Sequence, residues 1–293
     1  MANIDGEIDS QPDCWRRAVE RAALWEMALP HRGHRVATVG CGTSWFIGQA
    51  YAVLRERAGH GETDAFAASQ LPAGRRYDRV LAITRSGTTT EVLDLMRRLP
   101  PGTPMTVLTA DARSPAAQRA SDPVLLAFAD EKSVVQTRFA TTALALLRAH
   151  LGEDLTATIA DGRAALDARL PLDPAGVEQV TFLGNGWTVG LAHEAALKCR
   201  EAAGFWTESY PAMEYRHGPI AVAGPGRAVW VLGEAPAGLA DEVAGTGATV
   251  IHNGQRDPLA ELILVQRFAV ALAAHRGLDP DAPAHLTRSV VLA

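Results

Sequence analysis

The chain has 293 residues, of which 47% are hydrophobic and 21% charged, and its formal net charge is −5. This composition is typical of a globular protein and excludes a disordered or collagen-like chain. The length favours two domains or one large one. No basic run is long enough to follow a nucleic-acid backbone, so we expect no nucleic-acid partner.

The cysteines and the N-terminal residues indicate the compartment. Cys14, Cys41 and Cys199 are far apart and form no C-x-x-C pair, so the sequence indicates neither a disulfide framework nor a zinc site. Residues 1–10 are polar and acidic, unlike a signal peptide, and no stretch of about 18 uncharged apolar residues appears. We therefore expect a cytoplasmic protein that does not bind a membrane.

In the first half of the chain, short β-branched runs alternate with longer segments of helical spacing. This alternation predicts parallel sheets covered by helices. A glycine turn, Gly40-Cys41-Gly42, separates the first strand from its helix, and Pro100-Pro101 ends the second helix. The predicted strands are 35–39, 80–83, Met105–Thr109 and 123–126, and the predicted helices are 45–57 and 91–99. The first half is therefore expected to form one doubly wound unit.

The second half repeats this order. A strand at 180–183, the turn Gly184-Asn185-Gly186 and a helix over Thr188–Ala203 match the first strand, turn and helix, and a strand at 229–232 matches 80–83. The period of about 140 residues indicates a duplicated domain rather than a solenoid. We predict a first domain at 1–155, a connecting helix and linker at 156–175 and a second domain with a C-terminal tail at 176–293.

The turn after the second predicted strand, Thr84-Arg85-Ser86-Gly87-Thr88-Thr89, is rich in hydrogen-bond donors. Hydroxyl and guanidinium groups between a strand end and a helix start suit an anion such as phosphate. The alternative is an ordinary Ser/Thr N-cap turn. The matching turn in the second half contains Glu234, which would repel an anion, so we expect a single phosphate site.

The Gly40-x-Gly42 turn also invites a dinucleotide-binding interpretation, with Glu62 about 20 residues further on as the ribose partner. Trp45 occupies the third glycine position, and its bulk opposes the close helix approach that this motif needs. We therefore expect no nicotinamide or flavin cofactor and interpret the turn as part of a sugar site. Cys41 is interpreted as a small loop residue rather than a nucleophile, because no base lies near it in sequence.

Three charged residues, Glu194, Lys198 and Glu201, share one face of a predicted helix. Such a stripe is usually a set of solvated salt bridges. The irregular polar segment 208–219 favours a catalytic alternative, because it holds His217 before Gly218-Pro219. Aldose–ketose isomerisation needs a group that opens the sugar ring and a base that moves a proton between C1 and C2. His217 and Glu201 have the right chemistry, and no metal is required.

Six motifs in the same order resemble the sugar isomerase (SIS) domain family of double-SIS type, in particular the isomerase half of glucosamine-6-phosphate synthase and stand-alone phosphosugar isomerases and deaminases. The resemblance spans nearly the whole chain and implies two tandem flavodoxin-like SIS domains. The matching segments are 7–12 (E-I-x-x-Q-P in the family), 41–44 (C-G-T-S), 84–89 (S-x-S-G-x-T), 194–198 (E-G-A-L-K), 217–219 (H-G-P) and 285–290 (N-L-A-K-S-V).

The resemblance also implies roles for individual residues. Glu201 would be the isomerisation base, Lys198 would assist proton transfer or hold sugar hydroxyls, and His217 would open the ring from the neighbouring subunit of a homodimer. The residues implied to bind or line the phosphosugar site are Gly42, Thr43, Ser44, Thr84, Arg85, Ser86, Thr89, Val134, Gln136 and Arg288. No cofactor is implied.

Departures from the family pattern narrow the expected activity. The sequence begins Met1-Ala2-Asn3 and lacks the synthase's glutaminase, so we expect no ammonia release from glutamine. Arg288 stands where the synthase has an imine-forming lysine, and Gln136-Thr137-Arg138 replaces S-T-K. We predict a phosphosugar isomerase that acts on an amino- or keto-hexose 6-phosphate, with or without release of the amine. The alternatives are a fructosamine-phosphate deglycase and a non-catalytic phosphosugar-binding regulator.

Overall fold

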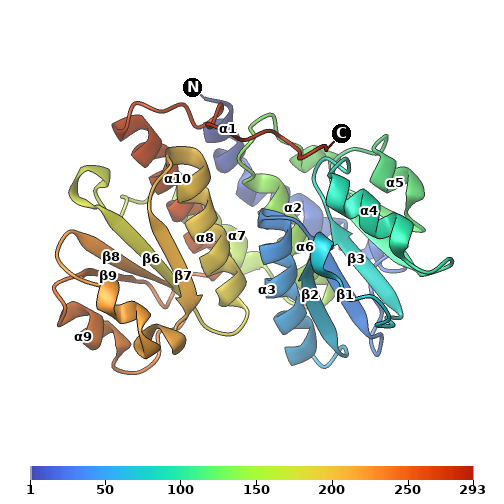
Figure 1. The fold of residues 1–293 in the computed structure, drawn as a ribbon, viewed down its shortest axis with the longest axis horizontal. Coiled ribbons are helices and arrows are strands. Elements are labelled where there is room, and N and C mark those ends of the chain that lie inside the picture. Colours follow the sequence, from blue (N-terminus) through green and yellow to red (C-terminus); the bar gives the residue numbers. More distant parts are fainter. Residues whose placement is uncertain (1, 293) are drawn as a thin grey trace. The chain divides into compact units, whose positions relative to one another are not determined.

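The computed structural model describes residues 2–292, which contain two separate parallel sheets (Figure 1). The chain divides into two compact units, each built around one sheet. The first unit consists of Asp13–Leu155 together with the tail from Thr287 onward. The second unit consists of Thr156–Leu286 together with the residues up to Pro12. The prediction of two tandem doubly wound α/β domains is confirmed.

The first unit has a five-stranded sheet in the order β2-β1-β3-β4-β5, with every neighbouring pair parallel. Strands β1 and β4 are buried along their whole length, which explains their continuous apolar, β-branched sequences. The strands are β1 (Val36–Gly40), β2 (Thr63–Ala67), β3 (Arg79–Ile83), β4 (Met105–Thr109) and β5 (Asp122–Leu125).

Helices cover both faces of this sheet. Val92 and Leu95 of α4 pack against Val80 and Val107 on one face. Helix α3 packs against β1 and β2 on the other face and contacts α6. The α-helices that begin or lie in this unit are α2 (Gln11–Glu20), α3 (Thr43–Arg57), α4 (Thr90–Arg98), α5 (Pro115–Arg119) and α6 (Arg138–His150). Short 3-10 turns are η1 (Ala22–Trp25), η2 (Ala68–Gln70) and η3 (Ala127–Ala129).

The second unit has a four-stranded parallel sheet in the order β7-β6-β8-β9. This order is that of β2-β1-β3-β4 in the first unit, which confirms the predicted duplication. Its strands are β6 (Gln179–Gly184), β7 (Thr207–Pro211), β8 (Arg227–Leu232) and β9 (Thr249–His252). Its helices are α1 (Asn3–Asp9), α7 (Thr156–Asp167), α8 (Thr188–Ala203), α9 (Leu239–Ala244) and α10 (Pro258–His275), with 3-10 turns η4 (Pro174–Gly176), η5 (Glu214–His217) and η6 (Pro219–Val222).

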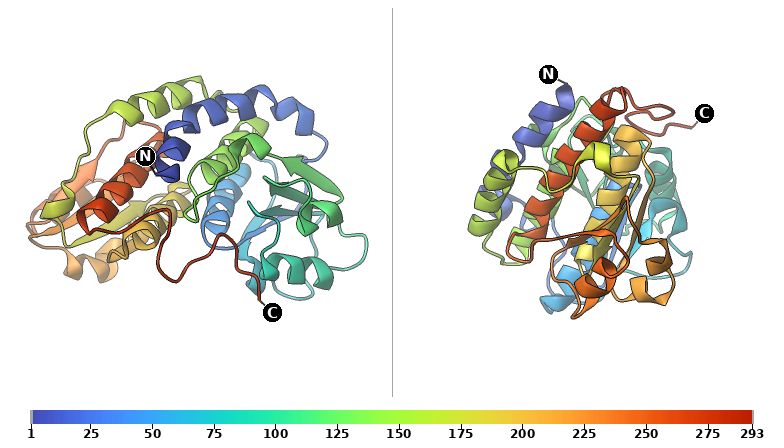
Figure 2. Two further views of the ribbon diagram at one scale, coloured as in Figure 1. Left: turned by 90° about the horizontal axis from the view of Figure 1, so that it is seen from above. Right: turned by 90° about the vertical axis from the view of Figure 1, so that its left-hand side faces the viewer.

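Helix α10 is the core helix of the second unit and lies against α8 and α7 (Figure 2). Phe268 of α10 packs edge-on against Trp230 of β8, and the Trp230 indole donates a hydrogen bond to Glu261 at 2.8 Å. Among residues 2–292, α10 alone is long and apolar enough to cross a membrane by length and composition, but 67% of that segment is buried inside the fold. Its apolar sequence is explained by this packing.

The unit boundaries differ from the predicted ranges 1–155 and 176–293 at both termini. The Asp281 carboxylate accepts hydrogen bonds from the backbone N–H groups of Asn3 and Ile4, and buried Gln11 donates to Gln266 of α10 at 2.6 Å. These bonds attach the first residues of the chain to the second unit. Helix α7, predicted as part of a connection, also packs against α10 and belongs to that unit.

Candidate active site

The Thr84–Thr89 turn follows β3 at the carboxyl edge of the first sheet. The Thr84 N–H continues the ladder by donating to Leu108 O at 2.9 Å. Gly87 then reverses the chain with a φ of +63°, and a Cβ at this position would lie 2.1 Å from the Ser114 hydroxyl oxygen. Only glycine fits this place, because both the backbone angle and the close contact exclude a side chain.

The hydroxyl groups of this turn gather around one side chain of the C-terminal tail. Ser289 Oγ lies 3.1 Å from Ser86 Oγ, 3.0 Å from Thr88 Oγ1 and 3.3 Å from Thr89 Oγ1. Thr89 is the N-cap residue of α4, yet its hydroxyl caps no backbone amide. The N-cap alternative is therefore wrong for Thr89, and the helix N-terminus is instead closed by Val290 O, which accepts from Thr90 N–H at 3.1 Å.

Arg85 differs from its predicted role as an anion donor. Its side chain is buried and its terminal nitrogens donate to Glu131 at 3.2 Å, Ser133 O at 2.9 Å and Val134 O at 3.3 Å. The same guanidinium also donates to Arg288 O at 3.1 Å. Arg85 therefore holds two segments beside the turn, the one that contains Val134 and Gln136 and the C-terminal tail. Its terminal nitrogens already donate hydrogen bonds to protein groups.

Arg288 also holds the tail in place. Its guanidinium donates to Glu131 O at 3.1 Å and forms an ion pair with Asp130. The backbone oxygen of Arg288 at the same time accepts from Arg85. Arg288 is therefore part of the attachment of the tail, and Ser289, which follows it, is a candidate site residue that the sequence interpretation missed. Its place in the terminal motif at 285–290 was the available signal.

The glycine turn after β1 lies at the same edge of the first sheet, because β1 and β3 are parallel neighbours. Gly42 has a φ of +52° and starts α3, and Thr43 and Ser44 in the first turn of this helix are buried. Burial and the nearby Glu91 carboxylate raise the pKa of Cys41 to about 11. The thiol is therefore protonated at neutral pH, which agrees with a small loop residue and argues against a nucleophile.

The charged stripe of α8 in the second unit is buried, so its interpretation as solvated salt bridges is wrong. Glu194 is 0% exposed and Lys198 is 1% exposed. Lys198 Nζ lies 3.3 Å from Glu194 Oε1 and 2.6 Å from Glu201 Oε2, whose side chain remains 22% exposed. Burial opposes the charge on Lys198, but the two carboxylates outweigh it and raise the pKa of its ammonium group.

The chain contains 28 lysine and arginine residues, and only Lys132 and Lys198 are lysines. One of these two lysines, Lys198, is therefore buried in the fold. Buried ion pairs contribute little to stability, because desolvation offsets their attraction. A compact ammonium group between two carboxylates, with one carboxylate reaching solvent, is a common arrangement for acid–base chemistry. The stripe is therefore the strongest catalytic candidate in the second unit.

His217 lies at the end of η5 and is exposed, and its side chain makes no hydrogen bond or ion pair with any other described residue. The topology separates it from Glu201 within one chain. Helix α8 starts at the carboxyl end of β6 and returns, so Glu201 in its last turn lies near the amino edge of the sheet. Strand β7 then runs to the carboxyl edge before His217. The five residues of β7 alone span roughly 17 Å.

Strand β7 covers Thr207–Pro211, so part of the 208–219 segment that was expected to be irregular is a paired strand. Within residues 2–292, no group of three or more His, Cys, Asp or Glu side chains lies close enough together to hold a metal ion.

The sequence is similar to curated relatives over most of its length. The chain is 26% identical over 294 residues to glutamine–fructose-6-phosphate aminotransferase (isomerizing) of Sulfurisphaera tokodaii, covering 88% of this chain and 50% of the relative. It is 27% identical over 335 residues to the enzyme of that name from Bradyrhizobium diazoefficiens, covering 94% of this chain and 55% of the relative. The chain thus spans about half the length of the curated relatives it matches. No family model matches the sequence.

A solved structure superposes on nearly the whole of this chain. Glucosamine-6-phosphate deaminase from Thermotoga maritima superposes with a TM-score of 0.86 at 25% identity, covering 99% of this chain and 100% of that one. The fold of this chain is a tandem doubled sugar isomerase (SIS) fold. The C-terminal domain of glucosamine-fructose-6-phosphate aminotransferase from Francisella tularensis shares the double-SIS fold, with a TM-score of 0.80 at 20% identity over 97% of this chain and 98% of that domain.

Proposed function

We propose that this double-SIS protein is a phosphosugar isomerase that interconverts aldose and ketose forms of a hexose 6-phosphate or of its 2-amino derivative. The observation that carries the proposal is the Lys198–Glu201 pair, in which a buried ammonium group holds a partly exposed carboxylate at 2.6 Å. A protein that only bound phosphosugars would need the hydroxyl-rich turn of the first unit but no such acid–base pair.

In this proposal, the hydroxyl-rich turn binds the phosphate. Ser86, Thr88, Thr89 and Ser289 bring four hydroxyl groups together, and hydroxyl donors form strong hydrogen bonds to a phosphate oxygen. Gly42, Thr43, Ser44 and Thr84 line the same sheet edge, where the ligands of open parallel sheets usually bind. Arg85 is proposed to position the binding groups rather than to contact the ligand, because it donates hydrogen bonds to Val134 O and to Arg288 O of the tail.

Glu201 is proposed as the base. Its carboxylate removes the C2 proton of the open-chain aldose, which gives an enediolate. The O2 hydroxyl proton passes to O1, and Glu201 returns its proton to C1 to form the ketose. Lys198 carries a raised pKa and is protonated at neutral pH, so it cannot accept the proton itself. Its role is to orient the Glu201 carboxylate and to donate a hydrogen bond to a sugar oxygen that becomes negatively charged.

His217 is proposed to open the sugar ring by transferring a proton at the ring oxygen. Since the topology sets Glu201 and His217 at opposite edges of the second sheet, one substrate is expected to meet Glu201 of one chain and His217 of another. A homodimer is therefore part of this proposal. The same proposal keeps the protein in the cytoplasm, where the three free cysteines remain reduced.

Two outcomes are open for a 2-amino sugar. Isomerisation alone leaves the amine on the sugar, whereas hydrolysis of the resulting C2 imine by one water molecule yields ketose 6-phosphate and ammonia. The solved relative from Thermotoga maritima is described as a deaminase, which supports the second outcome. A covalent imine with the protein is not part of the mechanism, because Arg288 is a guanidinium paired with Asp130.

The test is a panel of hexose 6-phosphates and 2-amino-2-deoxyhexose 6-phosphates, with ketose formation and ammonia release followed together. Glu201→Gln should lose turnover by at least a hundredfold and keep substrate binding, because the amide cannot accept a proton. Glu178→Gln is the matched control, since Glu178 is exposed. Ketose with ammonia identifies a deaminating isomerase, and ketose alone identifies a simple one.

The remaining functions make different predictions in the same assay. A deglycase would release an amine from a fructosamine phosphate in a Glu201-dependent way and leave the hexose phosphates unchanged. A regulator would bind sugar phosphates without turnover, and Glu201→Gln would then leave its binding and its biological role unaltered. Either result would remove the isomerase proposal.

A further inference from the structure

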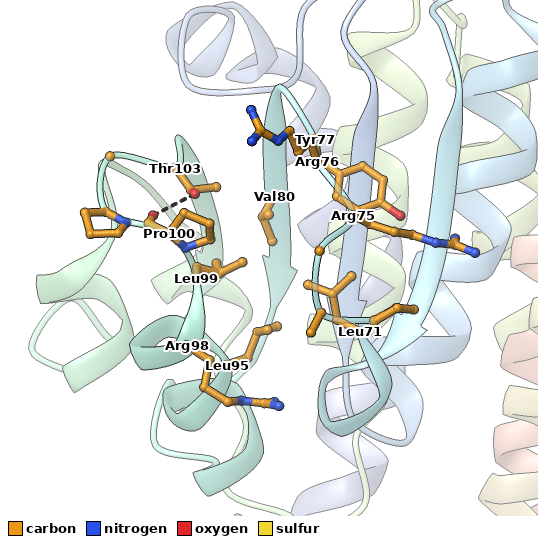
Figure 3. A pocket seen from close by; sticks show the side chains of 15 residues that line it. Leu71, Arg75, Arg76, Tyr77, Val80, Leu95, Arg98, Leu99, Pro100 and Thr103 are labelled. Carbon is orange, nitrogen blue, oxygen red and sulfur yellow. Dashed lines mark hydrogen bonds between the residues drawn. The ribbon is translucent and has the colours of Figure 1, made fainter.

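The first unit contains a cavity that has no part in the proposed reaction. Its volume is about 610 Å³, and it lies between the β2–β3 connection and the end of α4 (Figure 3). Val80, Leu95 and Leu99 form its floor, and the loop around Leu71 forms one side. The size falls within the range of pockets that hold small organic ligands, roughly 300–1,000 Å³.

The charge around this cavity has one sign. Arg75, Arg76 and Arg98 line it, and no aspartate or glutamate is among its lining residues. Arg75 is already engaged, since it pairs with Asp64 at 3.4 Å and lies over the Phe66 ring. The guanidinium groups of Arg76 and Arg98, by contrast, make no hydrogen bond or ion pair within the described part of the chain. In Figure 3 these two side chains lie at opposite ends of the apolar floor.

The lining also offers fixed flat surfaces. Tyr77 is held by its hydroxyl, which donates to Asp64 at 2.6 Å, and the turn Pro100–Thr103 is closed by a hydrogen bond from the Thr103 hydroxyl to Pro100 O at 2.8 Å. Gly74 and Gly102 carry no side chain over the opening and both have positive φ. The cavity therefore has ordered apolar walls with two uncommitted guanidinium groups at its rim.

We propose that this cavity binds a small organic anion with an aromatic or aliphatic body, such as a phosphate monoester. The apolar body would cover Val80, Leu95 and Leu99, and Arg76 or Arg98 would form charge-assisted hydrogen bonds to the anionic group. A small inorganic anion would leave the floor exposed, and a neutral apolar ligand would leave both arginines unpaired. Only a ligand with both features uses the whole cavity.

This site is separate from the hydroxyl-rich turn. Val80 lies near the amino end of β3, where its N–H donates to Pro104 O, and Thr84 follows the carboxyl end of the same strand. They are four residues apart along an extended strand, a separation of roughly 13 Å. Helix α4 links the same two places in the opposite direction, since it begins beside the turn and ends at Arg98. A ligand here would contact both elements that carry the turn, as an effector site requires.

The probe for the test is 1-naphthyl phosphate, with inorganic phosphate and 1-naphthol as probes that lack one feature each. Binding is measured by calorimetry on the whole chain that also carries Ser86→Ala, so that the hydroxyl-rich turn does not compete. We expect one site for 1-naphthyl phosphate, with at least tenfold weaker binding of the other two probes. The double variant Arg76→Ala/Arg98→Ala should weaken it at least fivefold.

Arg97→Ala is the matched control, because Arg97 neighbours Arg98 on α4 but is not among the lining residues of this cavity. A second variant, Ala73→Trp, keeps both arginines and fills the opening, and it should also abolish binding. The proposal is overturned if no binding occurs, if Arg97→Ala weakens binding as much as the double variant, or if inorganic phosphate binds equally well. None of these outcomes depends on whether the protein turns over a sugar phosphate.

Discussion

Lys198 Nζ and Glu201 Oε2 lie 2.6 Å apart on a face of α8 where the lysine is almost completely removed from solvent. Glu194 lies on the other side of the ammonium group at 3.3 Å and is itself fully buried. The three charges therefore depend on one another, because removing the central cation leaves a carboxylate in a region that water does not reach.

Lys198→Met should destabilise the second unit by about 3–5 kcal/mol, since Glu194 then lacks its cation. The double variant Glu194→Gln/Lys198→Met should recover more than half of this loss, because no buried charge remains. Urea unfolding followed by circular dichroism measures both. The other lysine, Lys132, is exposed, so Lys132→Met is the control and should change the free energy of unfolding little. Equal losses in the single and double variants would show that the charges are not coupled.

Ser86→Ala should weaken binding of a hexose 6-phosphate by about ten- to a hundredfold, the loss expected for one hydrogen bond to a charged group, about 1.5–3 kcal/mol. The fold should be unaffected, because the serine hydroxyl contacts only other hydroxyls and the Thr88 amide. Calorimetric titration measures the affinity, and the exposed Ser69→Ala serves as control. Unchanged binding by Ser86→Ala would place the phosphate elsewhere.

Gly87→Ala separates steric conflict from backbone strain. The new Cβ would lie 2.1 Å from Ser114 Oγ, in addition to the cost of a positive φ. Gly33 also has a positive φ, at 86°, but open space where a Cβ would stand. Gly33→Ala should therefore cost about 1–2 kcal/mol for the backbone angle alone. Gly87→Ala should cost clearly more and also weaken sugar-phosphate binding, as thermal unfolding and titration will show.

His34 and His60 should make the first unit sensitive to acid. Burial and neighbouring cationic groups, including Arg55, lower the pKa of both side chains. The folded state thus favours the neutral form, so below about pH 6.5 the unfolded chain binds more protons. Stability should be complete above that pH and fall as the pH decreases, by at most about 1.4 kcal/mol per pH unit for each histidine.

The variants His34→Gln and His60→Gln should each flatten this decline, whereas the exposed His275→Gln should not. The measurement is the midpoint of urea unfolding between pH 7.5 and 5. A decline of the same steepness in all three variants would assign the acid sensitivity to other groups.

The sequence predicted the central strands and one edge strand, β5. Strands β1, β3, β4, β6 and β8 are buried apolar runs, and this pattern identifies them without a structure. Strands β2, β7 and β9 escaped prediction, because they are short edge strands that are only partly buried. They are Thr63–Ala67, Thr207–Pro211 and Thr249–His252. Their pairing comes from the neighbouring strand rather than from their own sequences.

The candidate site was predictable in position but not in detail. Strand ends followed by glycine or hydroxyl-rich turns locate the edge of a parallel sheet from sequence alone. The burial of Glu194 and Lys198 was not predictable, since an i, i+4 pair has the same spacing on an exposed and on a buried helix face. The contact of Ser289 with Ser86 also lies beyond local sequence patterns, because some 200 residues separate the two.

The attachment of the tail has a consequence for the order in which the molecule is made. Ser289 and Val290 close the hydroxyl-rich turn of the first unit, although they are synthesised after every strand and helix of both sheets. A ribosome that has produced all of Asp13–Leu155 has therefore not yet produced a finished phosphate turn. The nascent first unit acquires the groups proposed for ligand binding only after the whole of the second unit has been translated.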